Sequence, residues 1–352
     1  MEISELLIYS NNNDASDIHI SSKHPPMFRI NGEIITLKID PLSPEQVKTI
    51  IYSIMTEKQR SEYEEHLEID FAINFADKRF RVNAFNTFNG AAAVLRNIPT
   101  TLKNLQQLNA PKILENLSEL HKGLVLVTGP TGSGKSTTLA AMVNYINKNF
   151  YRHIITIEDP IEFVHKSEKS LINQREVYVH TSSFAKALKS TLREDPNIIL
   201  VGELRDLETI KLALTAAETG HLVLGTLHTS SAAQTVDRII DVFPSEEKEM
   251  VRTMLSNSIE GIISQKLIKK ADGSGRVAAY EVLIANSAIR NLIKEGKIAQ
   301  ITSLMQINSQ SGMKIMKDSI FELVDKGVIT ADSAKSALNT TEQDKGQLTK
   351  GF

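Results

Sequence analysis

A run of small, glycine-rich residues that ends in a lysine and two hydroxyl residues could bind phosphate. The run is Gly129, Pro130, Thr131, Gly132, Ser133, Gly134, Lys135, Ser136 and Thr137. Its glycines let backbone N–H groups converge on phosphate oxygens, and the N-terminus of a following helix adds partial positive charge there. Lys135 can reach the β- and γ-phosphates of a nucleotide, and the Ser136 hydroxyl can ligate Mg²⁺. The spacing therefore matches the phosphate-binding P-loop.

Acidic side chains follow two other apolar runs of the chain. Glu203 follows the run 198–201, and Glu158, Asp159 and Glu162 follow the run 154–157. A carboxylate beside a P-loop holds Mg²⁺ or its waters, and we expect this of Glu203. One member of the second group can polarise the water that attacks a γ-phosphate, but the residue types alone do not choose among the three.

Two histidines flank the fourth apolar run, which begins at Leu222. No third ligand at zinc-site spacing accompanies His221 and His228. His228, at the end of the run, either hydrogen-bonds a phosphate or is a structural histidine with a satisfied ring, and the pattern leaves both open.

The elements that must position these groups are buried strands alternating with helices. The apolar runs are 124–127, 154–157, 198–201 and 222–224, and a helical pattern with Leu139, Met142, Val143 and Ile146 on one face follows the P-loop. In open parallel α/β sheets, ligands bind beyond the carboxyl ends of the strands. We therefore expect the P-loop, the acidic groups and His228 to converge on one site.

The first 98 residues predict a separate, smaller α/β domain with a largely antiparallel sheet. We expect strands at 17–21, 28–30, 34–37, 71–75, 79–83 and 91–98, with turns at Asn31-Gly32 and Asn89-Gly90. Ser43 and Thr56 each begin a helix through a capping box. Arg81 and Arg96 lie on strands here, and their spacing alone does not assign them to a nucleotide.

We place the domain boundaries at 1–98, a linker at 99–111 and a second domain at 112–352. Beyond Ala233 the pattern predicts mostly helices, with one begun by Ser245. A loop at 271–275 is expected between a helix and a strand at 277–282. The polar residues 340–352 predict a tail without fixed structure.

Composition describes an ordinary globular protein. The chain has 352 residues, 41% of them hydrophobic and 23% charged, with a net charge of −2 and no cysteine. This charge does not favour wrapping nucleic acid, and the lack of cysteine fits a reducing compartment. The N-terminus is acidic, and no apolar run approaches the ~20 residues that span a bilayer. We therefore expect a cytoplasmic protein.

Four of these motifs occur in the order found in the type II/type IV secretion ATPase superfamily, namely 129–136, 158–162, 202–206 and 220–228. The chain resembles the pilus-retraction, or twitching-motility, branch of that superfamily from about Ala15 to Val328. Three further stretches sharpen the resemblance: 173–177, 214–220 and the Ala-Ile-Arg-Asn-Leu-Ile sequence within 287–293. The last is more specific than the P-loop.

The resemblance implies a homohexameric motor with an N-terminal PAS-like domain and a C-terminal RecA-like P-loop ATPase domain. ATP and Mg²⁺ are its implied cofactors, with Ser136 and Glu203 on the metal. It assigns catalysis to the P-loop lysine, the catalytic glutamate, the Walker B glutamate, the His box and two arginines that close over the nucleotide: Lys135, Glu162, Glu203, His228, Arg81 and Arg96. The implied partners are an inner-membrane pilus platform protein and a paralogous retraction ATPase, without nucleic acid.

Several other functions share parts of this pattern. An accessory retraction paralogue has the same core, and a pilus-assembly or type II secretion ATPase usually adds a longer N-terminal region and a four-cysteine zinc site that this sequence lacks. A RecA-like nucleic-acid translocase is disfavoured by the near-neutral charge and by an aromatic content of 5%. A nucleotide-gated scaffold without turnover is disfavoured by the intact acidic groups.

Overall fold

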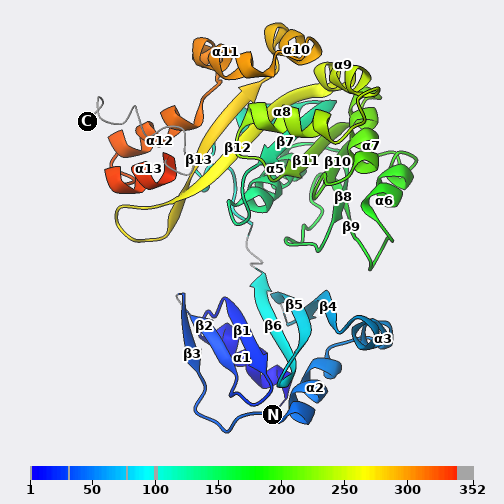
Figure 1. Cartoon of the computed structure of the whole chain (residues 1–352), viewed down its shortest axis with the longest axis vertical. Coiled ribbons are helices and arrows are strands. Elements are labelled where there is room, and N and C mark those ends of the chain that lie inside the picture. Colours follow the sequence, from blue (N-terminus) through cyan, green and yellow to red (C-terminus); the bar gives the residue numbers. More distant parts are fainter. Residues whose placement is uncertain (1, 31, 77, 99–101, 339–352) are drawn as a thin grey trace. The chain divides into compact units, whose positions relative to one another are not determined.

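The computed structural model describes residues 2–30, 32–76, 78–98 and 102–338. The chain divides into two compact units, Met1–Thr101 and Leu102–Phe352, which Figure 1 draws in blue to cyan and in teal to red. The boundary corrects the linker predicted for 99–111. Leu105 is only 2% exposed and packs in the core of the second unit with Leu114 and Leu117, so residues 102–111 belong to that unit.

In the part of the first unit that the structure describes, an antiparallel sheet is accompanied by three helices. Its strand order is β3-β2-β1-β6-β5-β4, and the neighbouring strands pair antiparallel, as the sequence pattern predicted. The strands are β1 (Asp17–Ser21), β2 (Met27–Ile30), β3 (Glu33–Thr36), β4 (Glu68–Phe75), β5 (Lys78–Thr87) and β6 (Gly90–Ile98). The helices are α1 (Ile3–Asn12), α2 (Pro44–Ser53) and α3 (Glu57–His66).

Local signals set the helix starts of this unit. The Ser43 and Thr56 hydroxyls each accept a hydrogen bond from the third residue of the following helix, so both predicted capping boxes are confirmed. Helix α1 was not predicted, although Leu6 and Leu7 are buried in the core. Of the predicted turn at Asn31-Gly32, the first residue lies outside the described residues.

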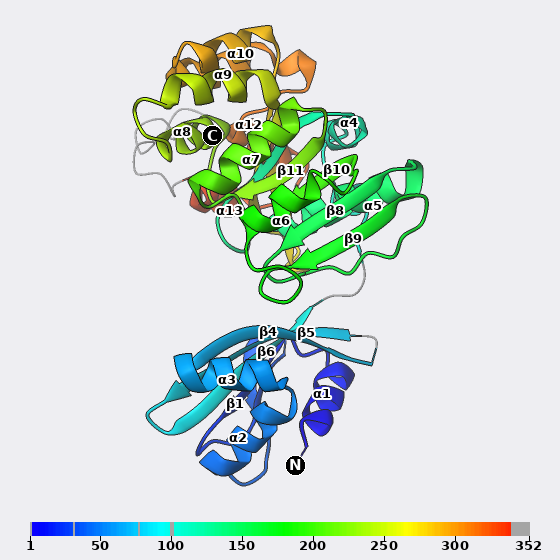
Figure 2. The ribbon, with the colours of Figure 1, turned by 90° about the vertical axis from the view of Figure 1, so that its right-hand side faces the viewer.

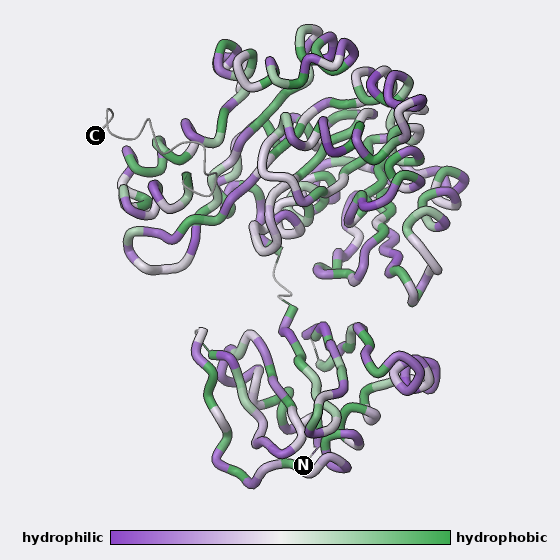
Figure 3. Tube along the Cα trace, viewed as in Figure 1, coloured by the Kyte–Doolittle hydropathy of each residue, from purple (hydrophilic) through white to green (hydrophobic). Residues whose placement is uncertain are grey.

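The second unit is built on a mainly parallel sheet in the order β13-β12-β7-β11-β10-β8-β9. Only β13 runs antiparallel to its neighbour within the described residues. The strands are β7 (Gly123–Thr128), β8 (His153–Glu158), β9 (Leu171–Glu176), β10 (Ile198–Val201), β11 (Leu222–Leu227), β12 (Ile259–Lys269) and β13 (Arg276–Ile284). Figure 3 shows extended apolar stretches along these strands, which is typical of strands covered on both faces.

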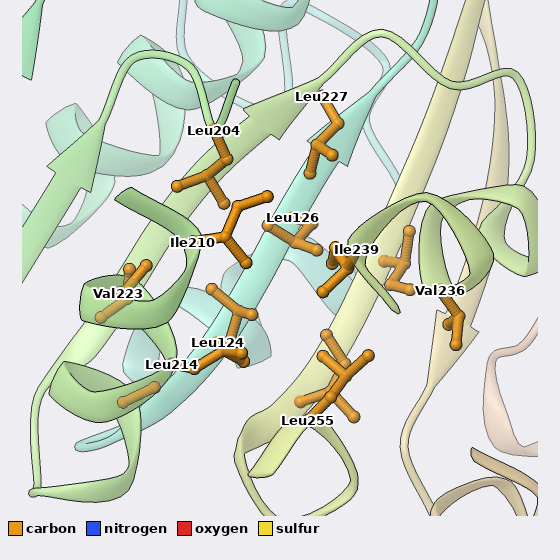
Figure 4. Packing of buried hydrophobic residues seen from close by; sticks show 14 of the residues in the cluster. Leu124, Leu126, Leu204, Ile210, Leu214, Val223, Leu227, Val236, Ile239 and Leu255 are labelled. Carbon is orange, nitrogen blue, oxygen red and sulfur yellow. The ribbon is translucent and has the colours of Figure 1, made fainter. Parts of the chain in front are cut away.

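Helices cover both faces of this sheet, as Figures 1 and 2 show. Alternate residues of β7 serve different faces: Leu124 and Leu126 pack with α7, α8 and α9 (Figure 4), whereas Val125 and Val127 pack with α4 and α5. The helices are α4 (Ile113–Glu119), α5 (Lys135–Asn149), α6 (Phe184–Thr191), α7 (Leu207–Glu218), α8 (Ala232–Asp241), α9 (Lys248–Ser258), α10 (Ser287–Lys294), α11 (Ile301–Ile307), α12 (Met316–Asp325) and α13 (Ala331–Leu338). Two short 3₁₀ helices are η1 (Ile298–Gln300) and η2 (Ser309–Ser311).

The region beyond Ala233 differs from its prediction. The predicted helix beginning near Ser245 is α9, but β12 follows it at once and pairs with β13 to form a long hairpin. The loop at 271–275 therefore joins two strands and not a helix to a strand. The segment 259–263 reads Ile-Glu-Gly-Ile-Ile, which shows neither strict alternation nor a clear helical period, so its pattern does not distinguish a strand from a helix. The predicted tail lies outside the described residues.

No helix in the described ranges of the chain combines the length and the apolar character needed to cross a membrane.

Candidate active site

The strand order brings the predicted groups to one edge of the sheet. Strands β7, β11, β10 and β8 are consecutive neighbours and run parallel. Their carboxyl ends lead into the P-loop, His228, Glu203 and Glu158, respectively. Each chemical group therefore comes from the end of a different strand, and a ligand beyond this edge would meet all of them.

The P-loop has a backbone that only glycine tolerates at its key positions. Gly129 has a φ of +144°, and a Cβ there would lie 2.4 Å from the carbonyl oxygen of Gln265. Gly134, with a φ of +90°, caps helix α5. Substitution at either position would strain the loop.

Lys135 is folded into this loop. Its Nζ atom donates hydrogen bonds to the carbonyl oxygens of Gly129 at 2.8 Å and Pro130 at 3.1 Å. Burial lowers the pKa of Lys135, while the negative charges of Glu203 and Glu162 oppose that effect. The ammonium group is thus held against the loop at the start of the helix, and the charges of two carboxylates act on it.

The residues of the loop fit a phosphate group. The Ser133 hydroxyl is buried, and within the described chain it has no hydrogen-bond partner. Gly132 has a φ of +75°, and no atom would lie within 4 Å of a Cβ there. An orphaned hydroxyl beside an uncrowded glycine backbone can supply donors to phosphate oxygens. We infer that the P-loop is suited to a nucleotide.

Glu203 is held from both sides. Its Oε2 atom accepts from Arg205 at 2.7 Å, and its Oε1 atom lies 3.3 Å from Nε2 of His228. Burial raises the pKa of Glu203, but the hydrogen bonds and charges of Arg205 and His228 outweigh burial and keep the pKa below its usual value. The carboxylate is therefore ionised at neutral pH, as a metal ligand must be.

His228 and His221 have different surroundings. His228 faces Glu203 through Nε2, and its Nδ1 atom lies 3.5 Å from the Nζ atom of Lys135. Nδ1 of His221 lies 3.1 Å from the carbonyl oxygen of Ala216, at the end of α7. His221 is thus a structural histidine, whereas His228 belongs to the P-loop cluster.

The structure separates the three acidic residues that follow β8. Glu158 accepts hydrogen bonds from Thr156 at 2.6 Å and Gln174 at 3.2 Å, and burial raises its pKa to about 7. Asp159 is exposed, and its charge acts on Arg205. Glu162 is half-buried, and its charge acts on Lys135. Glu162 is therefore the member of this group whose charge bears on the P-loop lysine.

Arg81 and Arg96 lie in the first unit, opposite each other in the β5–β6 register. Arg96 Nε donates to Asp17 at 2.8 Å, and Arg81 lies 3.5 Å from Asp70. The two arginines are thus neighbours in the sheet, and each forms an ion pair with an aspartate on the strand at its other side, β1 for Arg96 and β4 for Arg81. Their assignment to nucleotide chemistry stays a prediction.

Sequence reasoning missed the contribution of β12. Ser264 Oγ lies 2.7 Å from Thr128 Oγ1, and the Gln265 amide contacts both Ser133 and Thr138. Both residues lie within β12, at the level where β7 ends. No local signal indicates that this strand lies beside β7, so the contact could not be predicted from the sequence.

Comparison with known proteins identifies the family. The family model described as "Type II/IV secretion system protein" matches residues 3–274. The chain is 55% identical to the type IV pilus retraction ATPase PilT of Pseudomonas aeruginosa, covering 97% of this chain and 99% of that one. It is 58% identical to a twitching motility protein of Neisseria gonorrhoeae, covering 90% and 85%. The crystal structure of the pilus retraction motor PilT with bound ADP matches with a TM-score of 0.89 and 48% identity, over 96% of this chain and 97% of that one. The chain therefore belongs to the type II/IV secretion system protein family and is a close relative of the pilus-retraction ATPases within it.

Proposed function

We propose that this protein is an ATP-hydrolysing motor that powers the retraction of type IV pili. The observation that carries the proposal is the 55% identity to a pilus retraction ATPase over nearly the full length of both chains. The P-loop, Glu203 and His228 stand together as ATP hydrolysis requires. The intact acidic groups, with Glu162 as well as Glu203, disfavour a nucleotide-gated scaffold that does not turn over ATP.

Each polar residue of the site has a role in this proposal. Lys135 supplies positive charge to the β- and γ-phosphates, and the backbone of the P-loop supplies N–H donors. Glu162 orients the attacking water and accepts its proton. His228 holds Glu203 and contacts Lys135, so it links the carboxylate to the phosphate-binding lysine.

Mg²⁺ is the metal that this donor set would hold. The Ser136 hydroxyl follows the P-loop lysine, and Glu203 is an ionised carboxylate with oxygen donors that suit a hard cation. Glutamate is longer than the aspartate usual at this position, which favours contact through a bound water. When bound, the ion would neutralise charge on the phosphate oxygens.

The working unit in this proposal is a ring of six copies. The ring would act on a platform protein of the pilus machine at the cytoplasmic face of the inner membrane. The names of the relatives, a retraction ATPase and a twitching motility protein, support this placement. A paralogous retraction ATPase is a second partner in the proposal.

Gene deletion in the host tests the proposal. We expect cells that still display surface pili but do not retract them, with retraction restored by the wild-type gene and not by Lys135→Ala. Loss of surface pili would instead indicate an assembly ATPase. Retraction that persists with lower force would indicate an accessory motor. Either result would contradict the proposal, as would the absence of phosphate release by the purified protein with ATP and Mg²⁺.

A further inference from the structure

Strand β12 extends beyond the strand beside it and runs along the P-loop. The β7–β12 pairing ends at Ser264 and Thr128, and Gln265 follows where β7 has ended and Gly129 begins the loop. The carbonyl oxygen of Gln265 lies so close to Gly129 that a Cβ there would be 2.4 Å away. The backbone of β12 thus forms one wall of the loop.

The side-chain amide of Gln265 makes two hydrogen bonds, one with the P-loop and one with the first turn of α5. Nε2 donates to the carbonyl oxygen of Ser133 at 2.6 Å, and Oε1 accepts from the Thr138 hydroxyl at 2.8 Å. The side chain is buried, so water does not compete for these bonds. Thr138, in the first turn of α5, therefore fixes the direction of the amide, and the amide fixes the Ser133 carbonyl.

The Ser133 carbonyl belongs to the same planar peptide unit as the N–H group of Gly134. In a trans peptide these two groups point in opposite directions, so a bond that holds one also directs the other. Gly134 has a φ of +90° and no side chain to restrain this peptide. A flipped peptide would turn a carbonyl oxygen, and not an N–H donor, toward a bound phosphate.

We propose that Gln265 is a positioning residue that holds the Ser133–Gly134 peptide with its N–H group directed at the terminal phosphates of a nucleoside triphosphate. The inference rests on the proposed function for the identity of the ligand. It adds a residue from outside the P-loop to nucleotide recognition, contributed by the strand that ends the parallel part of the sheet.

Nucleotide affinity of full-length Gln265→Met tests this role, because methionine has similar length and neither hydrogen bond. We expect its dissociation constant for a fluorescent ADP to rise by about tenfold or more, and kcat/KM for ATP to fall at least as much. Thr138→Val keeps the hydrogen bond from Gln265 to Ser133 but removes the one that orients the Gln265 amide. We therefore expect a smaller rise in the dissociation constant for ADP. This second variant keeps the test decisive if Gln265→Met does not fold.

Ser264→Ala is the matched control, since it removes a buried hydrogen bond between β12 and β7 from the residue next to Gln265 without touching the loop peptide. We expect it to lower the melting temperature without nucleotide, while ADP affinity stays within about twofold of wild type. The proposal would be overturned if Gln265→Met and Thr138→Val both bound ADP as tightly as wild type. It would also be overturned if Ser264→Ala lost as much affinity as they do. A wild-type protein that binds ADP but does not hydrolyse ATP would contradict the motor function, while the affinity comparison would still test Gln265.

Discussion

His228 Nε2 lies 3.3 Å from the Oε1 atom of Glu203. The other ring nitrogen, Nδ1, is 3.5 Å from the Nζ atom of Lys135. His228 thus contacts a carboxylate through one ring nitrogen and an ammonium group through the other. The imidazole connects the ends of β10 and β11 to the P-loop. A change at the phosphates can therefore reach Glu203 through a single side chain.

Lys135→Ala should lower ATP turnover by at least ~10³, because it removes a charge aimed at the transferring phosphoryl group. Phosphate release by the purified protein measures this, with circular dichroism as a check of folding. Turnover within a few-fold of wild type would contradict the assignment of the P-loop.

Glu203 and Glu162 should have separable roles. Glu203→Ala should shift the Mg²⁺ titration of ATPase activity to higher concentration, since the variant lacks the ionised carboxylate held by Arg205 and His228. Glu162→Ala should bind nucleotide nearly as wild type does and slow the chemical step by about 10²–10⁴. The measurements are nucleotide titration and single-turnover hydrolysis. Loss of binding with a normal rate per bound ATP in Glu162→Ala would show that the roles are wrong.

Glu158 should make stability depend on pH. Burial raises its folded-state pKa from the model-compound value of 4.5 to about 7. A raised carboxyl pKa means that the folded state binds the proton more tightly than the unfolded state does. Protonation of Glu158 therefore stabilises the fold fully below pH 4.5, and this stabilisation is lost as pH rises through 7. Glu158→Gln should therefore melt about 2–6 °C above wild type at pH 8, and the gap should shrink toward pH 5. A gap that is constant with pH in thermal denaturation would rule out this cause.

Arg290 in α10 should serve force output and not hydrolysis. Its NH1 atom donates to the carbonyl oxygens of Ser256 and Asn257 at the end of α9, and its NH2 atom donates to Glu260 at the start of β12. Arg290→Ala should release α10 from these elements and impair pilus retraction in cells, while ATPase activity stays within about threefold of wild type.

The matched control for that variant is Lys294→Ala, which removes an exposed cation from the same helix. It should retract normally. Ile289 and Ile293 of α10 are fully buried, so a melting curve must accompany each variant. If Arg290→Ala kept its fold but lost both ATP hydrolysis and pilus retraction, α10 would be an ordinary core helix.

Arg81 and Arg96 should contribute to hydrolysis as the family resemblance implies. Arg81→Ala or Arg96→Ala should lower kcat by ~10²–10⁵, the range for losing an arginine that stabilises phosphoryl transfer, while assembly persists. Arg29→Ala is the matched control, because Arg29 also lies near Asp17, at 3.7 Å, but is not assigned to catalysis. Steady-state kinetics and light scattering measure the two properties. Equal losses in Arg29→Ala and Arg96→Ala would point to Asp17 and the stability of the first unit.

The sequence by itself determined the elements whose signals are local. The P-loop spacing, the apolar runs before the P-loop, Glu158 and Glu203, and the capping boxes at Ser43 and Thr56 each lie within a few neighbouring residues. Side-chain period, capping and glycine backbone preferences act over that range. The rule that ligands meet the carboxyl ends of parallel strands then placed the site without further information.

Only the tertiary structure decided which distant groups complete the site. Gln265 reaches Ser133 across 132 residues of sequence. The roles of Glu158 and Glu162 separated because one carboxyl is buried against Thr156 and Gln174, while the charge of the other acts on Lys135. Sheet order and burial set these contacts, and they depend on which strands become neighbours when the chain packs. For the same reason β12 could not be distinguished from a helix, because the pattern of its first residues fits either element until β7 lies beside it.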